Sequence, residues 1–549
     1  MILLFVSLVQ ANPLLQATEI EMNRALENLH LEGEVKPYWI GVKLSEGEYQ
    51  YSLSKNGGLF SSSSNELQQA RFEVRVGSPS FDNSNFDSSS NWGTGYLHLP
   101  TEDNELALRR ELWLGFDRAY KNALEAYSEK EAVFDGKQYP YPLEQNPAAV
   151  QQTEFKHYLP VEKGSIELGN QLSSLFLNQQ FEDHNVYVYS ESSASHYLNT
   201  EGFRSSQQMQ EIILRVDATI RLSDGSLHRD LRSWVAPNKD SLPSIQELEL
   251  ECKKMIAWLQ SLEGAPIEED YLGPVLFEEQ ASVELFRQLL QPQLSATPPL
   301  QQMPDFDGEL PLVIPNSRLG RRVLPNKWTV IDDVASHPEL ASFYEFDDQG
   351  IAPKRVELIK DGVVKNLLMS RIPRKMFTES TGHGRSLGQD REIAIPGTVE
   401  IRPDRHSSDR KLKKTALKMA RSAGLDYVLV IKRIETLAQT NNFEIAFSGS
   451  EQLSGLTLPV ESYRLYSDGR KEIVRGLSFV GVDRKVLRDI VLAAKQSPYY
   501  TVKDDSSGRY GIGMSSGISV SWSVPSVLIG EMELRGQGGQ EQRVVPPPE

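Results

Sequence analysis

The sequence predicts an α+β fold, in which an N-terminal unit of mixed helices and antiparallel sheet is followed by a sheet-rich, barrel-like C-terminal domain. Three observations lead to this prediction. Helical spacing of apolar residues is interspersed with strand-like patterns as far as residue 262. From Trp328 onward, short strand signals dominate. Between these regions, Gly264-Ala-Pro266 predicts a domain seam, because Gly and Pro interrupt regular structure.

The N-terminal half begins with an amphipathic helix and continues as strands with intervening helices. Residues 78–92 and 135–147 are expected to be loops, because they are rich in Ser, Asn and Asp or in Pro and Tyr. Asp224-Gly225 predicts a hairpin between the last two strands. Helices are expected over residues 12–31, 104–127, 165–181 and 244–262, and strands over 37–43, 48–53, 71–77, 186–190, 201–205, 212–222 and 227–234.

The C-terminal half opens with a predicted helix over residues 273–290. The following stretch, 291–315, contains six prolines and is expected to be irregular. Two more helices are expected, over 409–422 and 485–494. The predicted strands cover 329–334, 355–360, 363–368, 427–434, 444–447, 461–466, 472–480 and 518–522.

These boundaries divide the chain into an N-terminal domain over residues 12–263, a C-terminal domain over 264–535 and a flexible tail over 536–549. Residues 1–11 hold an apolar run, Ile2–Val9, followed by Gln10-Ala11, which is typical of a signal peptide although a cationic start is missing. The alternative is a short buried strand. If the segment is a signal peptide, the protein is exported to the periplasm; otherwise it is cytoplasmic. This run of eight residues is too short for a membrane span.

The composition excludes several classes of function. A formal net charge of −17 argues against nonspecific binding to nucleic acid or anionic lipid. The chain has one cysteine, Cys252, so an intrachain disulfide and a cysteine-rich metal cluster are both excluded.

Several segments resemble, in order, the TldD/PmbA family of peptidases, over roughly residues 35–535. They include the stretch that leads from Gly273 to Glu278 and the glycine-rich loop Thr381-Gly-His-Gly-Arg385. The other matching segments are 37–42, 57–64, 71–77, 463–470, 474–479 and 525–529. The resemblance implies a metallopeptidase-like fold. It also implies a zinc-binding helix, because the active member of the family carries His-Glu-x-x-x-His on a helix together with a later cysteine.

The zinc motif is degenerate in this sequence. At the positions where the resemblance places the two histidines stand Phe277 and Ser282, and only Glu278 matches the general base. No cysteine follows Cys252, so the third ligand is missing as well. We therefore expect no metal and no cofactor. Glu278, Glu279 and Glu284 form a carboxylate cluster that could bind a cation, but a solvated acidic helix face is the simpler expectation.

The loop Thr381–Arg385 is the second candidate site. Gly382 and Gly384 would let the backbone approach a ligand closely. His383 and Arg385 are the candidate substrate-binding residues, since they could hold a peptide carboxylate or carbonyl group. The alternative is a mobile loop with an exposed histidine.

Three functional hypotheses follow, and peptide hydrolysis by the chain itself stays open. The chain could be a zinc-free TldE/PmbA-like subunit that supports a zinc-bearing TldD-like partner, either as a heterodimer or after pairing with itself. It could instead be a stand-alone pseudo-peptidase that binds peptides, or a metallopeptidase with a rewired metal site. The expected partners are a paralogue or a second copy and a peptide substrate, without nucleic acid or a membrane span.

Overall fold

The computed structural model describes residues 12–86, 88, 97–101, 104–134, 153–161, 164–297, 319–372, 379–386, 392–436, 455–504 and 517–536. Some predictions lie outside these residues. They are the signal segment 1–11, the loop 135–147, most of the stretch 291–315, the strand 444–447 and the tail beyond residue 536.

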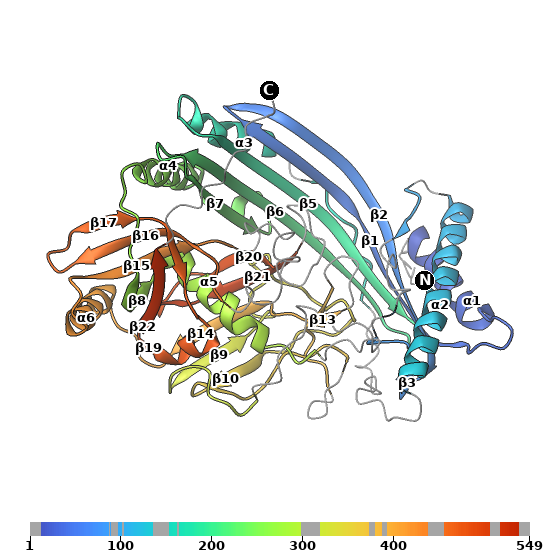
Figure 1. Cartoon of the computed structure of the whole chain (residues 1–549). Coiled ribbons are helices and arrows are strands. Elements are labelled where there is room, and N and C mark those ends of the chain that lie inside the picture. The colour runs from blue at the N-terminus through green and yellow to red at the C-terminus, as the bar shows by residue number, and fades with distance from the viewer. Residues whose placement is uncertain are drawn as a thin grey trace, which may run out of the picture.

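A strongly curved antiparallel sheet dominates the N-terminal half and arches over a C-terminal lobe (Figure 1). The strand order is β3-β2-β1-β5-β6-β7, with β4 paired to β2. Its strands are β1 (Pro37–Lys55), β2 (Gly58–Ser78), β3 (Phe81–Asp82), β4 (Leu97–His98), β5 (Asp183–Asn199), β6 (Arg204–Arg221) and β7 (Leu227–Ala236).

The main strands are longer than the sequence predicts. The strands expected over 37–43 and 48–53 are one strand, β1, because Gly47 continues the ladder instead of turning it. A Cβ on Gly47 would lie 2.4 Å from the carbonyl oxygen of Ser192, so glycine permits close approach between neighbouring strands. The real turn is Asn56-Gly57, where both residues have positive φ angles, as a tight two-residue hairpin requires.

In the described part of the chain, four helices cover the outer face of the arch, and all four were predicted. Helices α1 (Pro13–Asn28) and α2 (Glu105–Phe134) pack at one end, against Val42 and Leu44 of β1. Helices α3 (Ser165–Ser173) and α4 (Ile245–Ser261) pack at the other end, against β5 and β6. Asn12 caps α1, and Ser244 forms a capping box on α4. Because side chains alternate along a strand, odd-numbered residues of β1 face the C-terminal lobe.

The described residues of the C-terminal lobe form two larger sheets and a short two-stranded one. The six-stranded sheet has the order β11-β10-β9-β14-β21-β20, and the seven-stranded sheet has the order β17-β16-β15-β8-β22-β18 with β19 on β22. Their strands are β8 (Tyr271–Phe277), β9 (Trp328–Asp332), β10 (Val356–Lys360), β11 (Val363–Val364), β14 (Thr398–Pro403), β15 (Tyr427–Ile434), β16 (Pro459–Tyr466), β17 (Lys471–Val474), β18 (Leu477–Phe479), β19 (Ile490–Gln496), β20 (Tyr500–Asp504), β21 (Ile518–Ser523) and β22 (Pro525–Gly536).

Two helices complete this lobe as far as its residues are described. Helix α5 (Glu279–Leu290) is almost wholly buried in a core that it shares with both sheets. Helix α6 (Asp409–Ser422) covers the opposite face of the seven-stranded sheet. The mixed, sheet-rich α+β prediction is therefore confirmed, although the large curved sheet belongs to the N-terminal half. All strands of that sheet precede residue 237, and those of the lobe follow residue 270. The proposed domain limits at 263 and 264 stay predictions.

Two helix predictions in this lobe need correction. Residues 273–277 of the helix expected over 273–290 belong to strand β8, and α5 begins only at Glu279. The helix expected over 485–494 is a short 3-10 turn, Arg484–Asp489, followed by β19. Both segments hold uninterrupted apolar runs, which periodicity cannot assign to helix or strand. No helix in the described part of the chain is long and apolar enough to cross a membrane.

Candidate functional site

The first candidate site lies where β8 meets α5. Strand β8 runs between β15 and β22, and its last residue, Phe277, pairs with Ile431 and Val527. The Phe277 side chain has no exposed surface and stacks on Phe479, with ring centroids 6.1 Å apart. Phe277 is therefore a core residue at the end of a strand. It does not lie on the helix that the family resemblance expects to bind zinc.

The next two residues turn the chain into the helix. Glu278 is the residue before α5, and its backbone N–H donates to the carbonyl oxygen of Ile431. Its carboxylate forms an ion pair with Lys413 of α6 at 3.0 Å and accepts a hydrogen bond from Tyr463. Burial, reinforced by the Glu278 charge, raises the pKa of Tyr463. Glu279 has a φ of +49° and pairs with Lys432. A glutamate in the left-handed region stores backbone strain at this junction.

The remaining motif positions also have structural partners. The Ser282 hydroxyl, which is buried, donates to the carbonyl oxygen of Pro525 at 2.6 Å. Glu284 was expected on a solvated face, but it is fully buried and bonded to Arg287 and Gln288. A buried carboxylate needs such partners, because an unpaired charge in the core is strongly unfavourable. Each carboxylate of the predicted cluster is thus neutralised by a nearby cation.

This donor set does not fit the zinc ion that the resemblance implies. Helix α5 contains neither His nor Cys at any position, so no shift of the motif along the helix restores imidazole or thiolate ligands. Within the residues that the structure describes, no group of three or more His, Cys, Asp or Glu side chains is arranged to hold a metal ion.

The second candidate site, the loop Thr381–Arg385, is part of the lobe's interior. His383 has no exposed surface. Its Nε2 atom lies 3.2 Å from Oδ1 of Asp332, and its Nδ1 atom lies 2.9 Å from the carbonyl oxygen of Thr381. Asp332 in turn accepts a hydrogen bond from the backbone N–H of Gly397, the residue before β14. The ring therefore joins the loop to β9, and the expectation of an exposed histidine is wrong.

The glycines on either side of His383 allow this burial. Gly382 has a φ of +73°, and a Cβ there would lie 2.3 Å from the carbonyl oxygen of Ala352. A Cβ on Gly384 would lie 2.3 Å from Oε1 of Gln349. These glycines permit close packing against the protein's own backbone and side chains. Contact between a peptide and Gly382, His383 or Gly384 stays a prediction that would require this packing to open.

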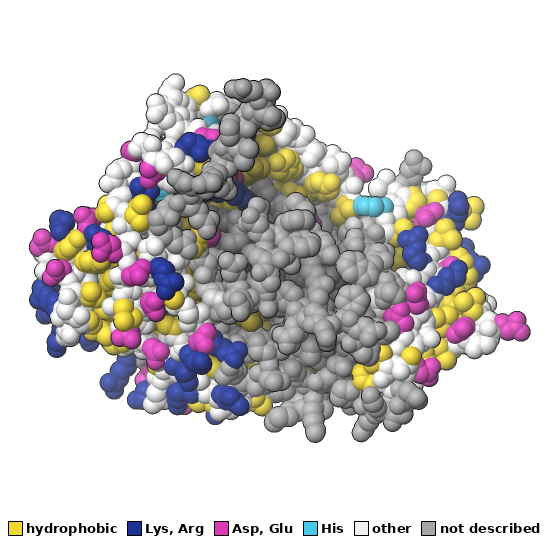
Figure 2. Space-filling view, in the orientation of Figure 1, with side chains coloured by type: hydrophobic (Ala, Val, Ile, Leu, Met, Phe, Trp, Pro, Cys, Tyr) yellow, Lys and Arg dark blue, Asp and Glu magenta, His cyan; other side chains and the backbone are white. Residues whose placement is uncertain are grey.

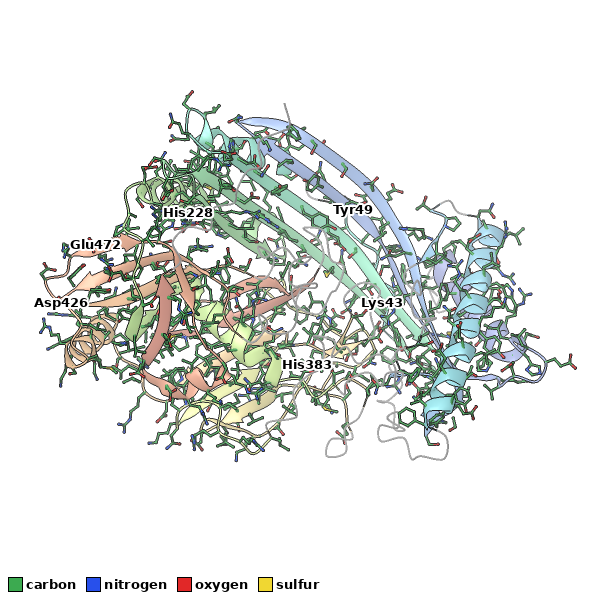
Figure 3. All side chains as sticks on the ribbon, viewed as in Figure 1. Lys43, Tyr49, His228, His383, Asp426 and Glu472 are labelled. Atoms are coloured by element: carbon green, nitrogen blue, oxygen red, sulfur yellow. The ribbon has the colours of Figure 1, made fainter. Side chains whose placement is uncertain are left out.

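Arg385 lies at the border between the lobe and the arch. Its guanidinium group stacks on the Tyr344 ring at 4.2 Å and lies 3.8 Å from Asp348. Asp348 also binds Lys43 of β1, with 2.6 Å between Nζ and Oδ1. Burial of Asp348 opposes its ionisation, but Lys43 and Arg385 outweigh this effect and lower its pKa. Figure 3 shows Lys43 and His383 near the lower end of the arch.

The adjacent acid, Asp347, has a different environment. Its carboxylate accepts backbone N–H groups of Gln349, Ile351 and Gly384. Burial nevertheless raises the pKa of Asp347 to about 7. The two neighbouring carboxyls thus differ because only Asp348 reaches the cations. Sequence reasoning identified the loop but missed Asp332, Asp347, Asp348 and Lys43. The one sequence signal for these residues was two adjacent acids, Asp347 and Asp348, shortly before Gly350, a pattern typical of a turn.

Together, the fold and the first site define a metallopeptidase-like frame that lacks the donors of a zinc centre. Residues 270–536 match the model of the PmbA/TldA metallopeptidase C-terminal domain. A metalloprotease of Methanocaldococcus jannaschii is 31% identical over 136 residues, which is 24% of this chain and 30% of that protein. A metalloprotease of Archaeoglobus fulgidus is 33% identical over 97 residues, 18% of this chain and 22% of that protein. The alignments thus span less than a third of either relative's length.

Solved structures share the fold over almost the whole chain. A protein of Thermotoga maritima, described as a suggested modulator of a DNA gyrase, has a TM-score of 0.60 at 17% identity, over 94% of this chain and 99% of that one. TldE of Thermococcus kodakarensis has a TM-score of 0.56 at 11% identity, over 95% of this chain and 100% of that one. The C-terminal part of the chain, residues 270–536, therefore belongs to the TldD/PmbA family.

Proposed function

We propose that this chain is a zinc-free subunit of a TldD/PmbA-type peptidase, which supports peptide cleavage by a zinc-bearing partner. The observation that carries the proposal is the set of side chains at the junction of β8 and α5, where the resemblance places the zinc ligands. The helix and its surrounding sheets are retained, but Phe277, Ser282 and Glu284 serve only packing, hydrogen bonding and internal ion pairing. A chain that has the peptidase fold but lacks the zinc-ligating side chains can form part of a peptidase without performing the chemistry.

The inner face of the arch supports a role in holding peptides. Four tyrosines from β1 and β5 lie together there, with Tyr49 next to Tyr189 at 6.0 Å and Tyr51 next to Tyr187 at 6.2 Å between ring centroids. Figure 2 shows hydrophobic side chains along the underside of the arch, and Figure 3 places Tyr49 above Lys43 on the same strand. Aromatic rings offer rigid contact area to an extended peptide. In this proposal, the tyrosines rather than the buried His383 touch the peptide.

The direct test mixes the purified chain with a TldD-like chain that carries His-Glu-x-x-x-His. Each protein is assayed alone and in the mixture with a fluorogenic peptide, with and without a chelator. We expect no cleavage by this chain alone, no stoichiometric zinc in it by elemental analysis, and chelator-sensitive cleavage that rises in the mixture. Cleavage by this chain alone that a chelator abolishes would refute the proposal, and so would a failure of the chain to change the partner's activity.

The tyrosine patch has its own test. Tyr49→Ala with Tyr51→Ala should weaken binding of a labelled unfolded peptide about tenfold, because two aromatic contacts are lost. Leu59→Ala, on an exposed part of β2, is the matched control and should leave the affinity unchanged. Equal peptide affinity for the tyrosine variant and the wild-type protein would remove the inner face from the proposal.

A further inference from the structure

The charge of this protein is distributed unevenly along the chain. Residues 1–269 contain 22 Lys and Arg against 39 Asp and Glu, which accounts for the whole formal charge of −17. Residues 270–549 contain 36 of each kind and are neutral overall. Within this neutral half, helix α6 carries six Lys and Arg but only one acid, Asp409. Figure 1 places α6 at the outer border of the lobe, on the side away from the arch.

Five of these cations form an exposed row, the basic stripe, which consists of Arg410, Lys411, Lys414, Lys418 and Arg421. None of the five forms an ion pair with a residue that the structure describes. The sixth cation, Lys413, pairs with Glu278. The buried side of α6 consists of Leu412, Ala416 and Ala420. The basic stripe therefore contributes neither to the core nor to the ion pairs of the described lobe.

The basic stripe also opposes the stability of its own helix. Arg410 and Lys411 lie in the first turn, near the positive end of the helix macrodipole, where cations are unfavourable. Residues three or four positions apart are neighbours on a helix surface, and like charges there repel each other. Four pairs of this kind occur in the stripe: 410 with 414, 411 with 414, 414 with 418, and 418 with 421. An unpaired arrangement that destabilises the helix indicates a role in binding an anionic partner.

We propose that the basic stripe docks an acidic segment of a polypeptide in extended conformation. Arg410, Lys414 and Lys418 follow one another at intervals of four residues, which is about 6 Å along the helix axis. Alternate side chains of an extended peptide point to one side and are about 6.6 Å apart. A peptide with Asp or Glu at alternate positions can therefore bring successive carboxylates to successive cations of the stripe. That the docked polypeptide is a substrate rests on the proposed function, whereas the docking itself is a property of this chain alone.

Other anionic partners fit the basic stripe less well. Helices that lie on a membrane surface insert Trp, Phe or Leu side chains, and proteins that bind single-stranded nucleic acid stack the bases on aromatic rings. Apart from the stripe, the exposed residues of α6 are Asp409 and Ser422, so the helix offers neither kind of side chain. The negative charge of residues 1–269 also repels a long polyanion more strongly than a short acidic segment.

The first experiment measures peptide binding by this chain alone. The probe is a labelled peptide of alternating Glu and Ser, and a peptide of alternating Gln and Ser is the uncharged reference. Lys414→Glu/Lys418→Glu should weaken binding of the Glu-Ser peptide about tenfold, because it reverses two central charges of the stripe. Lys360→Glu/Lys365→Glu makes the same change in net charge at exposed positions of the β10–β11 hairpin, and as the matched control it should weaken binding less than about twofold. Fluorescence anisotropy at about 50 mM salt measures the affinities.

The second experiment separates binding from structure. Lys414→Glu/Lys418→Glu converts three of the four like-charge pairs into pairs of opposite charge. The unfolding free energy, measured by urea unfolding, should therefore be unchanged or higher in the variant whose peptide affinity falls. A variant that loses stability together with affinity would overturn the proposal, because the stripe would then have a structural role.

Three binding results would also overturn the proposal. They are equal affinity of the wild-type protein for the Glu-Ser and Gln-Ser peptides, equal affinity of the wild-type and stripe variants for the Glu-Ser peptide, and tighter stripe-dependent binding of a short single-stranded DNA or of phosphatidylserine vesicles than of the Glu-Ser peptide. None of these measurements involves cleavage or a zinc-bearing partner. Failure of the mixed cleavage assay would therefore refute the proposed function without changing the outcome for the stripe.

Discussion

Replacing Lys43 by methionine should destabilise the protein, because this change removes the closest cation of a buried carboxylate. Asp348 has 7% of its side chain exposed, and Lys43 has 17%. Loss of one partner from a buried ion pair costs about 3–5 kcal/mol. Arg385 at 3.8 Å and the Ser386 backbone N–H at 2.7 Å still hold Asp348, so we expect a smaller cost, about 2–4 kcal/mol.

A double-mutant cycle separates the ion pair from packing. Asp348→Asn alone should cost about 1–2 kcal/mol, since the amide oxygen can still accept from Ser386. Lys43→Met with Asp348→Asn should cost less than the sum of the two single changes, with a coupling energy of about 1–3 kcal/mol. Urea unfolding followed by tryptophan fluorescence gives these values from the midpoints and slopes.

The same strand supplies a control. Lys55 pairs with Asp183 at 2.9 Å, but 29% and 54% of their side chains are exposed. Lys55→Met should therefore cost less than about 1 kcal/mol. The reasoning is refuted if Lys43→Met is no more costly than Lys55→Met, or if the double variant equals the sum of its parts within about 0.5 kcal/mol.

Three further predictions address the candidate sites. Phe277→His with Ser282→His should not create a zinc site, because the third ligand is missing, and stoichiometric zinc binding in a calorimetric titration would contradict this. The double variant should lower the unfolding free energy by about 3–6 kcal/mol, because it buries two imidazoles without designed partners. Ser282→Ala should lower it by about 1 kcal/mol, and urea unfolding measures both values. Burial raises the pKa of Asp347 to about 7, so the folded protein holds a proton that the unfolded chain releases above about pH 4. The contribution of Asp347 to the unfolding free energy should therefore fall by up to about 4 kcal/mol between pH 4 and 7. Asp347→Asn should remove this pH dependence, and an unchanged pH profile would show that Asp347 ionises normally. Gly384→Ala should cost about 1–3 kcal/mol, because its Cβ would lie 2.3 Å from Gln349 Oε1, and a variant with wild-type stability would mean that the loop yields easily.

The success of the sequence predictions depends on whether an element has one exposed side. Helix α6 was predicted to the residue, because its outer face is polar. Strand β8 was misassigned, since α5 covers one of its faces and α6 the other, and such a strand shows no alternation. For the same reason, the zinc motif was expected to lie wholly on a helix, whereas its first position is Phe277 and α5 begins at Glu279.

The candidate site was only partly predictable, because its partners are distant in sequence. The loop around His383 was found from its glycines, but its burial depends on Asp332, 51 residues earlier. Lys43 lies 305 residues before Asp348, and nothing local in either segment indicates that they meet. Composition suggested that the acidic residues were solvated, whereas Glu284 and Asp348 are buried with cationic partners.

The length of the arch strands makes the molecule intolerant of odd-numbered changes in chain length. Along β1, even-numbered side chains such as Val42 and Leu44 support the outer helices, while odd-numbered ones such as Lys43 and Tyr49 face the lobe. Removing one residue near Gly47 would exchange the two sets over all later positions of the strand. Removing two would shorten the strand but restore the parity. Natural or engineered length variation in this sheet should therefore occur in pairs of residues or be confined to the turns.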